Sequence, residues 1–197
     1  MAISSTRLTF LYTGKYNTAG GKYTQFSKSD LDKLSHVTGF VVSVTGIYDV
    51  YQTGPFADLI SDVMAQVSIV AQTGKPFYIG IPAVNFSSST YTRRSADYTN
   101  LKNNYILKIW SRISANSTYK NLFKGFYCTN ERVFGTTNVS SPVSSNAQIG
   151  LLNDLAYLIR NDTSQNIRKE FIWSPYLGYN NTYYEINTNI GIIAKRT

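Results

Sequence analysis

The chain has 197 residues, of which 43% are hydrophobic and 14% aromatic, and its formal net charge is +8. This length predicts one domain over residues 1–197, and this apolar content excludes a disordered chain. A single cysteine (Cys128) and a single histidine (His36) exclude an internal disulfide framework and leave too few soft ligands for a zinc site.

The hydrophobic pattern predicts short apolar strands that alternate with amphipathic helices. The clearest helix begins at Pro55, and its apolar residues recur at spacings of three and four from Phe56 to Val70. A brief helix is expected to begin with a Ser/Asp cap. In chain order, the predicted elements are strand 7–12, helix 29–35, strand 37–45, helix 55–70, strand 76–83, helix 95–115, strand 123–130, helix 146–160, and strands 170–176 and 190–194.

Side chains alternate along three of these strands between an apolar face and a face that is smaller and more polar. The apolar face, made of Phe40, Val42, Val44, Phe77, Ile79, Ile81, Phe126 and Cys128, is expected to pack helices. A sheet with helices on both faces favours unbroken Val/Ile/Leu runs, whereas a barrel lumen accepts polar and aromatic side chains. The pattern therefore favours a parallel (β/α) barrel, and an open doubly wound sheet is the alternative.

A complete TIM barrel needs eight strand–helix units and about 250 residues. Six strands within 197 residues predict an incomplete TIM barrel that lacks about two strands. The first and last strands of such a sheet are templates for pairing with another chain, so a homo-oligomer is predicted. The strand over 190–194 (IGIIA) is apolar and nearly C-terminal, and it is the expected edge for this pairing.

Several classes of function are disfavoured by missing motifs. The chain contains neither GxGxxG nor GxxxxGK[ST], so no nucleotide cofactor is expected, and it contains no GxSxG. Its basic residues are spread out, with Arg93-Arg94 and Lys195-Arg196 as adjacent pairs, so nucleic-acid binding is not expected. No stretch approaches the roughly 18 apolar residues of a membrane-spanning helix, and the N-terminal segment MAISSTRLTF lacks the apolar run of a signal peptide.

The polar composition points to a neutral ligand. The chain has 21 Ser, 20 Thr, 17 Asn and 16 Tyr, against 15% charged residues. Such surfaces hydrogen-bond neutral partners and are typical of proteins that face carbohydrate or extracellular solvent, although a plain solvated surface gives the same counts. A neutral glycan is therefore the expected partner, and an extracellular or cell-surface location is favoured.

One dipeptide suggests a reaction. Glycoside hydrolysis uses one carboxylic acid to protonate the leaving oxygen and a second carboxylate as nucleophile or base. Asn130-Glu131, at the end of the fourth predicted strand, resembles the acid/base signature of retaining TIM-barrel glycosidases. The segments HVTGFVVS, KPFYIGIP, FKGFYCTNERV and FIWSPYLGYN are similar to poorly characterised bacterial glycosidase-like barrel proteins. The resemblance implies that Glu131 is the acid/base and that Asn130 positions a sugar hydroxyl; a salt bridge from Glu131 to Arg132 is the alternative.

The resemblance also exposes a departure from the family. The family's nucleophilic Glu lies at the end of the seventh strand, and this chain stops after the sixth. Asp49 and Glu185 lie near predicted strand ends but match no family position. The implied function is a glycoside hydrolase-like carbohydrate-binding protein with weak or no hydrolytic activity as an isolated chain. The alternative is a non-enzymatic, self-assembling structural protein that forms arrays or crystals, including a toxin-associated one.

Aromatic residues near the predicted strand ends are candidates for stacking on sugar rings, with polar neighbours as hydrogen-bond partners. The same residues could instead pack structurally or form a protein interface. The candidate ligand-binding residues are Tyr12, Tyr48, Asp49, Asn85, Asn130, Trp173, Tyr176 and Tyr179.

Overall fold

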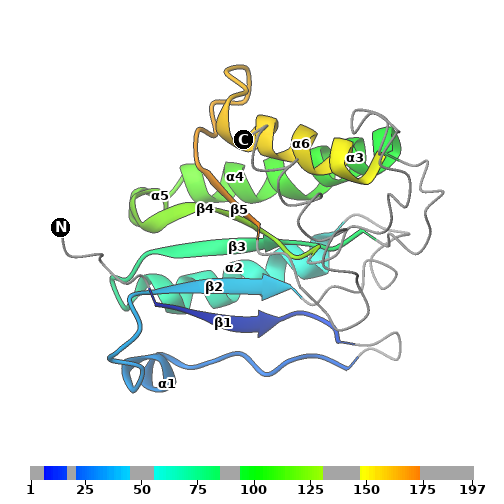
Figure 1. The fold of residues 1–197 in the computed structure, drawn as a ribbon. Coiled ribbons are helices and arrows are strands. Elements are labelled where there is room, and N and C mark those ends of the chain that lie inside the picture. Colours follow the sequence, from blue (N-terminus) through cyan, green and yellow to red (C-terminus); the bar gives the residue numbers. More distant parts are fainter. Residues whose placement is uncertain (1–6, 17–20, 45–55, 85–93, 131–146, 174–197) are drawn as a thin grey trace, which may run out of the picture.

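The structure is a computed structural model that describes residues 7–16, 21–44, 56–84, 94–130 and 147–173. Within these ranges five strands form one sheet, and helices connect them (Figure 1). The strands are β1 (Leu8–Thr13), β2 (Gly39–Val44), β3 (Phe77–Ile81), β4 (Phe123–Cys128) and β5 (Glu170–Trp173). The helices are α1 (Lys28–Asp32), α2 (Ala57–Ala71), α3 (Arg94–Leu101), the π-helix η2 (Lys102–Ile106), α4 (Leu107–Ser114), α5 (Ser117–Leu122) and α6 (Ala147–Arg160).

The described sheet is parallel throughout, and its strand order β1-β2-β3-β4-β5 follows the sequence. Parallel neighbours need crossover connections, which the helices supply. The predicted parallel α/β fold is therefore confirmed. Five of the predicted strands are present with ends that differ by at most three residues, and the strand predicted over 190–194 lies outside the described residues.

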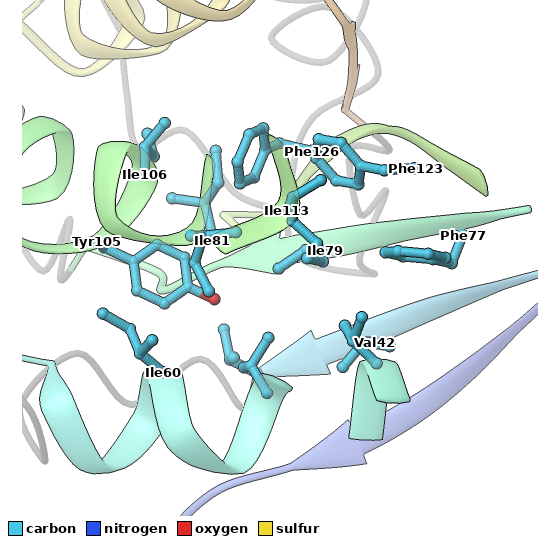
Figure 2. Close-up of a cluster of buried hydrophobic side chains, with 14 of the residues drawn as sticks. Val42, Ile60, Phe77, Ile79, Ile81, Tyr105, Ile106, Ile113, Phe123 and Phe126 are labelled. Carbon is cyan, nitrogen blue, oxygen red and sulfur yellow. The ribbon is translucent and has the colours of Figure 1, made fainter. Parts of the chain in front are cut away.

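One face of the sheet packs against the helices, as the side-chain alternation predicted. A single apolar cluster combines strand residues such as Phe40 and Ile79 with residues of α2, η2, α4 and α6. Figure 2 shows this packing around Tyr105, whose ring meets Phe56 edge-on at 5.6 Å between centroids. The Tyr105 hydroxyl donates to the carbonyl oxygen of Gly80 at 2.7 Å, so its one polar group is satisfied inside the core.

The helical segment after β3 differs from its prediction as one α-helix over 95–115. Helices α3 and α4 are joined through the π-helical turn η2, which contains Tyr105. A π-turn accommodates an extra residue and re-aims the side chains near it. The sequence pattern also missed α5, whose N-cap is the Asn116 side chain, which accepts from the Tyr119 amide at 3.0 Å.

The brief helix predicted over 29–35 begins and ends earlier, as α1. Ser27 is its N-cap, and Ser27 and Asp30 bond to each other's backbone amides in a capping box. This reciprocal pairing satisfies two donors that the first helical turn leaves unpaired. The cap therefore precedes the predicted start by two residues.

The opposite face of the sheet carries a smaller cluster made of strand residues only. Val41, Tyr78 and Tyr127 form it, and Leu8 and Ile172 pack against them. These residues alternate with the helix-facing ones along each strand. We call this side, which also carries Phe10, Tyr12, Ser43, Gly80, Gly125 and Glu170, the concave face.

The sheet curls toward this face. Phe10 on β1 and Tyr127 on β4 are separated by two strands, which in a flat sheet would place their backbones about 14 Å apart at roughly 4.8 Å per strand. Their ring centroids nevertheless lie 5.0 Å apart in an edge-to-face contact. Three glycines, Gly39, Gly80 and Gly125, line the inside of the curve, and a Cβ at each would come within 3.0 Å of a backbone atom of the adjacent chain segment. The described strands therefore form a curved sheet with a concave inner surface.

Candidate functional site

The concave face carries a continuous row of aromatic rings, which we call the aromatic row. It consists of Tyr127, Phe10, Tyr12, Tyr23 and Tyr16 in spatial order. Successive ring centroids lie 5.0, 6.5, 5.7 and 5.2 Å apart. The Tyr127 end is buried within the curve, whereas the other four side chains are 37 to 46% exposed. The row therefore runs from the floor of the concave face to its open rim.

Backbone bonds between residues 14–16 and residues 21–23, just beyond β1, complete the row. The Tyr23 amide donates to the carbonyl of Gly14 at 3.0 Å, and the Tyr16 amide donates to the carbonyl of Gly21 at 2.8 Å. Gly14 has a φ of 84°, in the region that favours glycine. The Tyr16 ring covers Gly21 so closely that a Cβ there would overlap it. These contacts hold Tyr16 and Tyr23 beside Tyr12.

A glutamine of α2 anchors the segment that follows Tyr23. The buried Gln66 side chain accepts from the amide of Phe26 at 2.9 Å and donates to the carbonyl of the same residue at 3.3 Å. The Lys22 ammonium also lies 3.0 Å from the carboxylate of Asp62 on α2. The end of the row that contains Tyr16 and Tyr23 is therefore tied to the helical layer through α2.

The amino-terminal end of the concave face holds an acid–phenol pair. The Tyr78 hydroxyl donates to Oε2 of Glu170 at 2.6 Å, across β4. Gly125 lies between them in the ladder and leaves room for the Tyr78 ring to cross. Burial, and then the hydrogen bond to Glu170 and its charge, raise the pKa of Tyr78 well above its usual range. Glu170 therefore holds Tyr78 as a neutral donor.

This pair predicts a specific pH dependence of stability. Because the folded state raises the pKa of Tyr78, its contribution is complete below the ordinary value of 10.0 and is lost as the pH rises above that value. Between pH 8 and pH 11, the free energy of unfolding of the wild-type chain should fall by about 1 kcal/mol more than that of the Tyr78→Phe variant. Urea unfolding of both proteins at the two pH values measures this difference, and parallel losses in the two proteins would contradict it.

Asn130, predicted to position a sugar hydroxyl, joins the ends of two strands. Its amide oxygen accepts from the amide of Val84 at 2.8 Å, and its amide nitrogen donates to the carbonyl of Val84 at 2.7 Å. The Thr129 hydroxyl makes a similar bond to the carbonyl of Ile81. These bonds extend the pairing of β3 and β4 beyond the last strand residues. An amide has two donors and two acceptor lone pairs, so this clamp uses half of the Asn130 capacity.

Trp173, predicted to stack on sugars, lies on the helix side of β5. Its indole nitrogen donates to the carbonyl of Asn130 at 2.6 Å, and its half-buried ring packs against Cys128, Ile149 and Leu152. The structure therefore brings Asn130 and Trp173 together at the carboxyl end of the sheet. Tyr12, the third described candidate, lies in the aromatic row instead.

The remaining candidates cannot be placed in this geometry. The proposed acid/base Glu131 and the ligand-binding candidates Tyr48, Asp49, Asn85, Tyr176 and Tyr179 lie outside the described residues, as does Glu185. Their roles stay predictions. Within the described ranges, the concave face contributes one carboxylate, Glu170, which is paired with Tyr78 at its amino-terminal end.

Sequence reasoning missed several members of the site for two reasons. Phe10 alternates with Leu11 and shares the face of Tyr12, so its position was available from the pattern LTFLYT. Tyr23 and the Tyr78–Glu170 pair depend on contacts between distant residues, which local periodicity does not encode. Tyr78 and Glu170 are 92 residues apart.

Comparison of the chain with protein-family models, curated proteins and solved structures gave no match. In the part of the chain that the structure describes, no helix is both long and apolar enough to cross a membrane. The same part contains no group of three or more His, Cys, Asp or Glu side chains placed to hold a metal ion. The site is therefore defined by its own geometry, and the aromatic row is its most distinctive feature.

Proposed function

We propose that this chain is a glycosidase-like, incomplete (β/α) barrel that binds neutral glycans through the aromatic row. The observation that carries the proposal is the run of four exposed rings, from Phe10 to Tyr16, in contact with one another along the concave face. Exposed aromatics in such a run offer apolar surface to the C–H faces of sugar rings, and the tyrosine hydroxyls offer hydrogen bonds at its edge.

Three features support a barrel-like architecture as the frame of this site. The strand order follows the sequence, the helical cluster occupies one face, and the sheet curls toward the other. A doubly wound sheet reverses its strand order at a switch point and has helices on both faces. Ligand sites of (β/α) barrels lie at the carboxyl ends of the strands, where Tyr12 and Asn130 are found.

Rigidity of the row favours binding. Each immobilised side chain costs roughly 0.5–1.5 kcal/mol on association unless it is already ordered in the free protein. Contacts among the rings, the Gly14–Tyr23 bond and the Gln66 anchor order these side chains before any ligand arrives. An acid/base role for Glu131 belongs to the same proposal and rests on the resemblance alone.

The test is isothermal titration calorimetry against a panel of soluble cell-wall and plant glycans. Tyr12→Ala should weaken binding about tenfold. Burial of an aromatic side chain contributes about 1.4 kcal/mol, which corresponds to a tenfold change in affinity. Tyr157→Ala is the matched control, because Tyr157 is 60% exposed on α6, away from the row. Its affinity should equal that of the wild type.

Two outcomes would contradict glycan binding by the row. If titration with every glycan of the panel gives no heat of binding, the proposal is wrong. Equal weakening by Tyr12→Ala and Tyr157→Ala would show that the contact, if present, does not use the concave face. Circular dichroism of both variants separates a lost contact from a lost fold.

Self-assembly is the second candidate, because β1 is an edge strand among the described strands. Among the described strands it pairs with β2 alone, Phe10 and Tyr12 are exposed on its concave side, and residues 21–23 bond to residues 14–16 just beyond its end. A strand that pairs on one side only is a template for pairing with a second chain. Light scattering at micromolar concentration is expected to give a mass above that of the 22.1 kDa monomer. A mass of one chain that does not change on dilution would contradict assembly and leave the glycan proposal untouched.

A further inference from the structure

A second site lies at the opposite end of the sheet, where β4 and β5 begin and α6 ends. An open pocket of about 390 Å³ is found there, within the usual size range of small-molecule sites. We call it the basic pocket, and its lining residues are Lys124, Arg160, Asn161, Arg168, Lys169 and Glu170. These residues come from two separate stretches of sequence, so the cluster is assembled by the fold.

The charges of this pocket are unbalanced. Four of its lining side chains are cationic, and Glu170 is the single carboxylate among them. One Glu170 oxygen already accepts the Tyr78 hydroxyl on the concave side. A fifth cation, Lys120, lies close by, since its carbonyl oxygen accepts from the Lys169 ammonium at 3.3 Å. Like charges that line one pocket repel one another, and a bound anion would relieve this repulsion.

A bulge directs one of these cations into the pocket. The register of β3 and β4 shifts so that Phe77 pairs with Phe123 and Tyr78 pairs with Gly125, which leaves Lys124 as the extra residue. In regular alternation Lys124 would share the concave face, because Phe123 faces the helices. The bulge instead exposes it at the basic pocket. Bulges often re-aim a side chain beside a functional site.

The turn between α6 and β5 places two more cations at the pocket. Arg168 has a φ of 47°, in the left-handed region that costs a residue with a Cβ about 1 kcal/mol or more. A bond from the Lys169 amide to the carbonyl of Ile159 at 3.0 Å, together with burial of Ile167, holds the turn in this form. The left-handed conformation of Arg168 therefore costs free energy, and it places Arg168 and Lys169 side by side at the pocket.

Of the four cations that line the pocket, Lys169 is the most buried. Its stem is half-buried, and its ammonium lies 5.9 Å from the centroid of the Phe123 ring. Burial, followed by the charges of Lys124 and Lys120, lowers the pKa of Lys169. A bound anion would act in the opposite direction and favour the charged ammonium.

We propose that the basic pocket binds a phosphate or sulfate group, either as the free anion or as a monoester. Arginine presents a planar fork of donors that matches the oxygens of such groups, and lysine adds point charges. Arg168 and Arg160 supply the forks, Lys124 and Lys169 the point charges, and Asn161 an amide donor. The volume leaves room for a small organic group on the ester. This site lies on the other end of the sheet from the aromatic row and does not depend on the glycan proposal.

The experiment measures binding to the wild-type chain and to two doubly substituted variants by calorimetry at constant ionic strength. The ligands are inorganic phosphate, glucose 6-phosphate and a sulfated polysaccharide, with sodium chloride and glucose as blanks. Lys124→Gln with Arg168→Gln should weaken binding of the anionic ligands at least tenfold. Lys108→Gln with Arg112→Gln removes the same charge from exposed positions on α4 that do not line the pocket, and should leave the affinity within twofold.

The ligands distinguish the sources of the anion. Phosphate that binds as tightly as glucose 6-phosphate assigns the pocket to the free group, whereas an ester at least tenfold tighter assigns it to a monoester. Equal loss in both double variants would show that only net charge matters and would overturn the site. No binding by the folded wild-type chain, verified by circular dichroism, would overturn it as well.

Discussion

Replacing Gly125 by alanine is expected to lower the free energy of unfolding by about 3 kcal/mol or more, because overpacking a rigid site commonly costs 1–3 kcal/mol and sometimes exceeds it. A Cβ at Gly125 would overlap the carbonyl oxygen of Glu170 and crowd the carbon and nitrogen of the same residue. These are backbone atoms of the neighbouring strand, so they cannot turn aside as a flexible side chain would. The pairing of β4 with β5 must shift to admit the methyl group.

The consequences of that shift reach both proposed sites. Gly125 follows the bulge at Lys124 and pairs with Glu170, which contacts Tyr78 on one side and lines the basic pocket on the other. The variant should therefore lose anion binding together with stability. Gly74→Ala is the control, since a Cβ there meets nothing within 4 Å and its φ of 69° accounts for a cost of about 1 kcal/mol.

Chemical denaturation followed by circular dichroism measures both variants. The expected order is wild type, then Gly74→Ala, then Gly125→Ala as the least stable. If Gly125→Ala were as stable as Gly74→Ala, the close approach of β4 and β5 at this position would be wrong, and with it the geometry of the bulge.

The sequence predicted the layers of this fold because their signal is local. In PFYIGIP, alternate residues face the helices and the concave side, and the burial of Phe77, Ile79 and Ile81 in the helix-facing cluster confirms it. The same local rule placed Tyr78 and Tyr127 on the opposite face. A period of two fixes the face of every residue in a strand without reference to any other strand.

Features that depend on distant partners were not predictable in this way. The bulge at Lys124 arises from the register of two strands, and the π-turn contains Tyr105, whose hydroxyl bonds to the distant carbonyl of Gly80. The basic pocket joins residues near 124 to residues near 168, although neither stretch contains a basic run on the scale of a nucleic-acid motif. Of the predicted site, Tyr12 was named from its place near the end of a strand, and the structure places it in an aromatic cluster; its partner Tyr23 depends on backbone bonds between residues 14–16 and 21–23.

The two faces of the sheet should differ sharply in what they contribute to stability. Phe126 is fully buried on the helix side, where its ring meets Phe123 edge-on at 5.2 Å, and Phe126→Ala is expected to lower the free energy of unfolding by about 3–5 kcal/mol. Phe10 is the matched control on the concave face. It is 37% exposed and contacts Tyr12 and Tyr127, so Phe10→Ala should cost about 1–2 kcal/mol.

This difference bears directly on function. If both faces of the sheet contributed equally to the free energy of unfolding, a ligand could not bind the aromatic row without disturbing the fold. If stability is concentrated among the helix-facing residues, the exposed rings are available to a glycan at little cost, and Phe10→Ala should reduce glycan affinity in a chain that remains folded. Urea unfolding of the two variants, read beside their calorimetric titrations, tests this separation. Equal destabilisation by both would place Phe10 in the structural core and would weigh against the aromatic row as a binding surface.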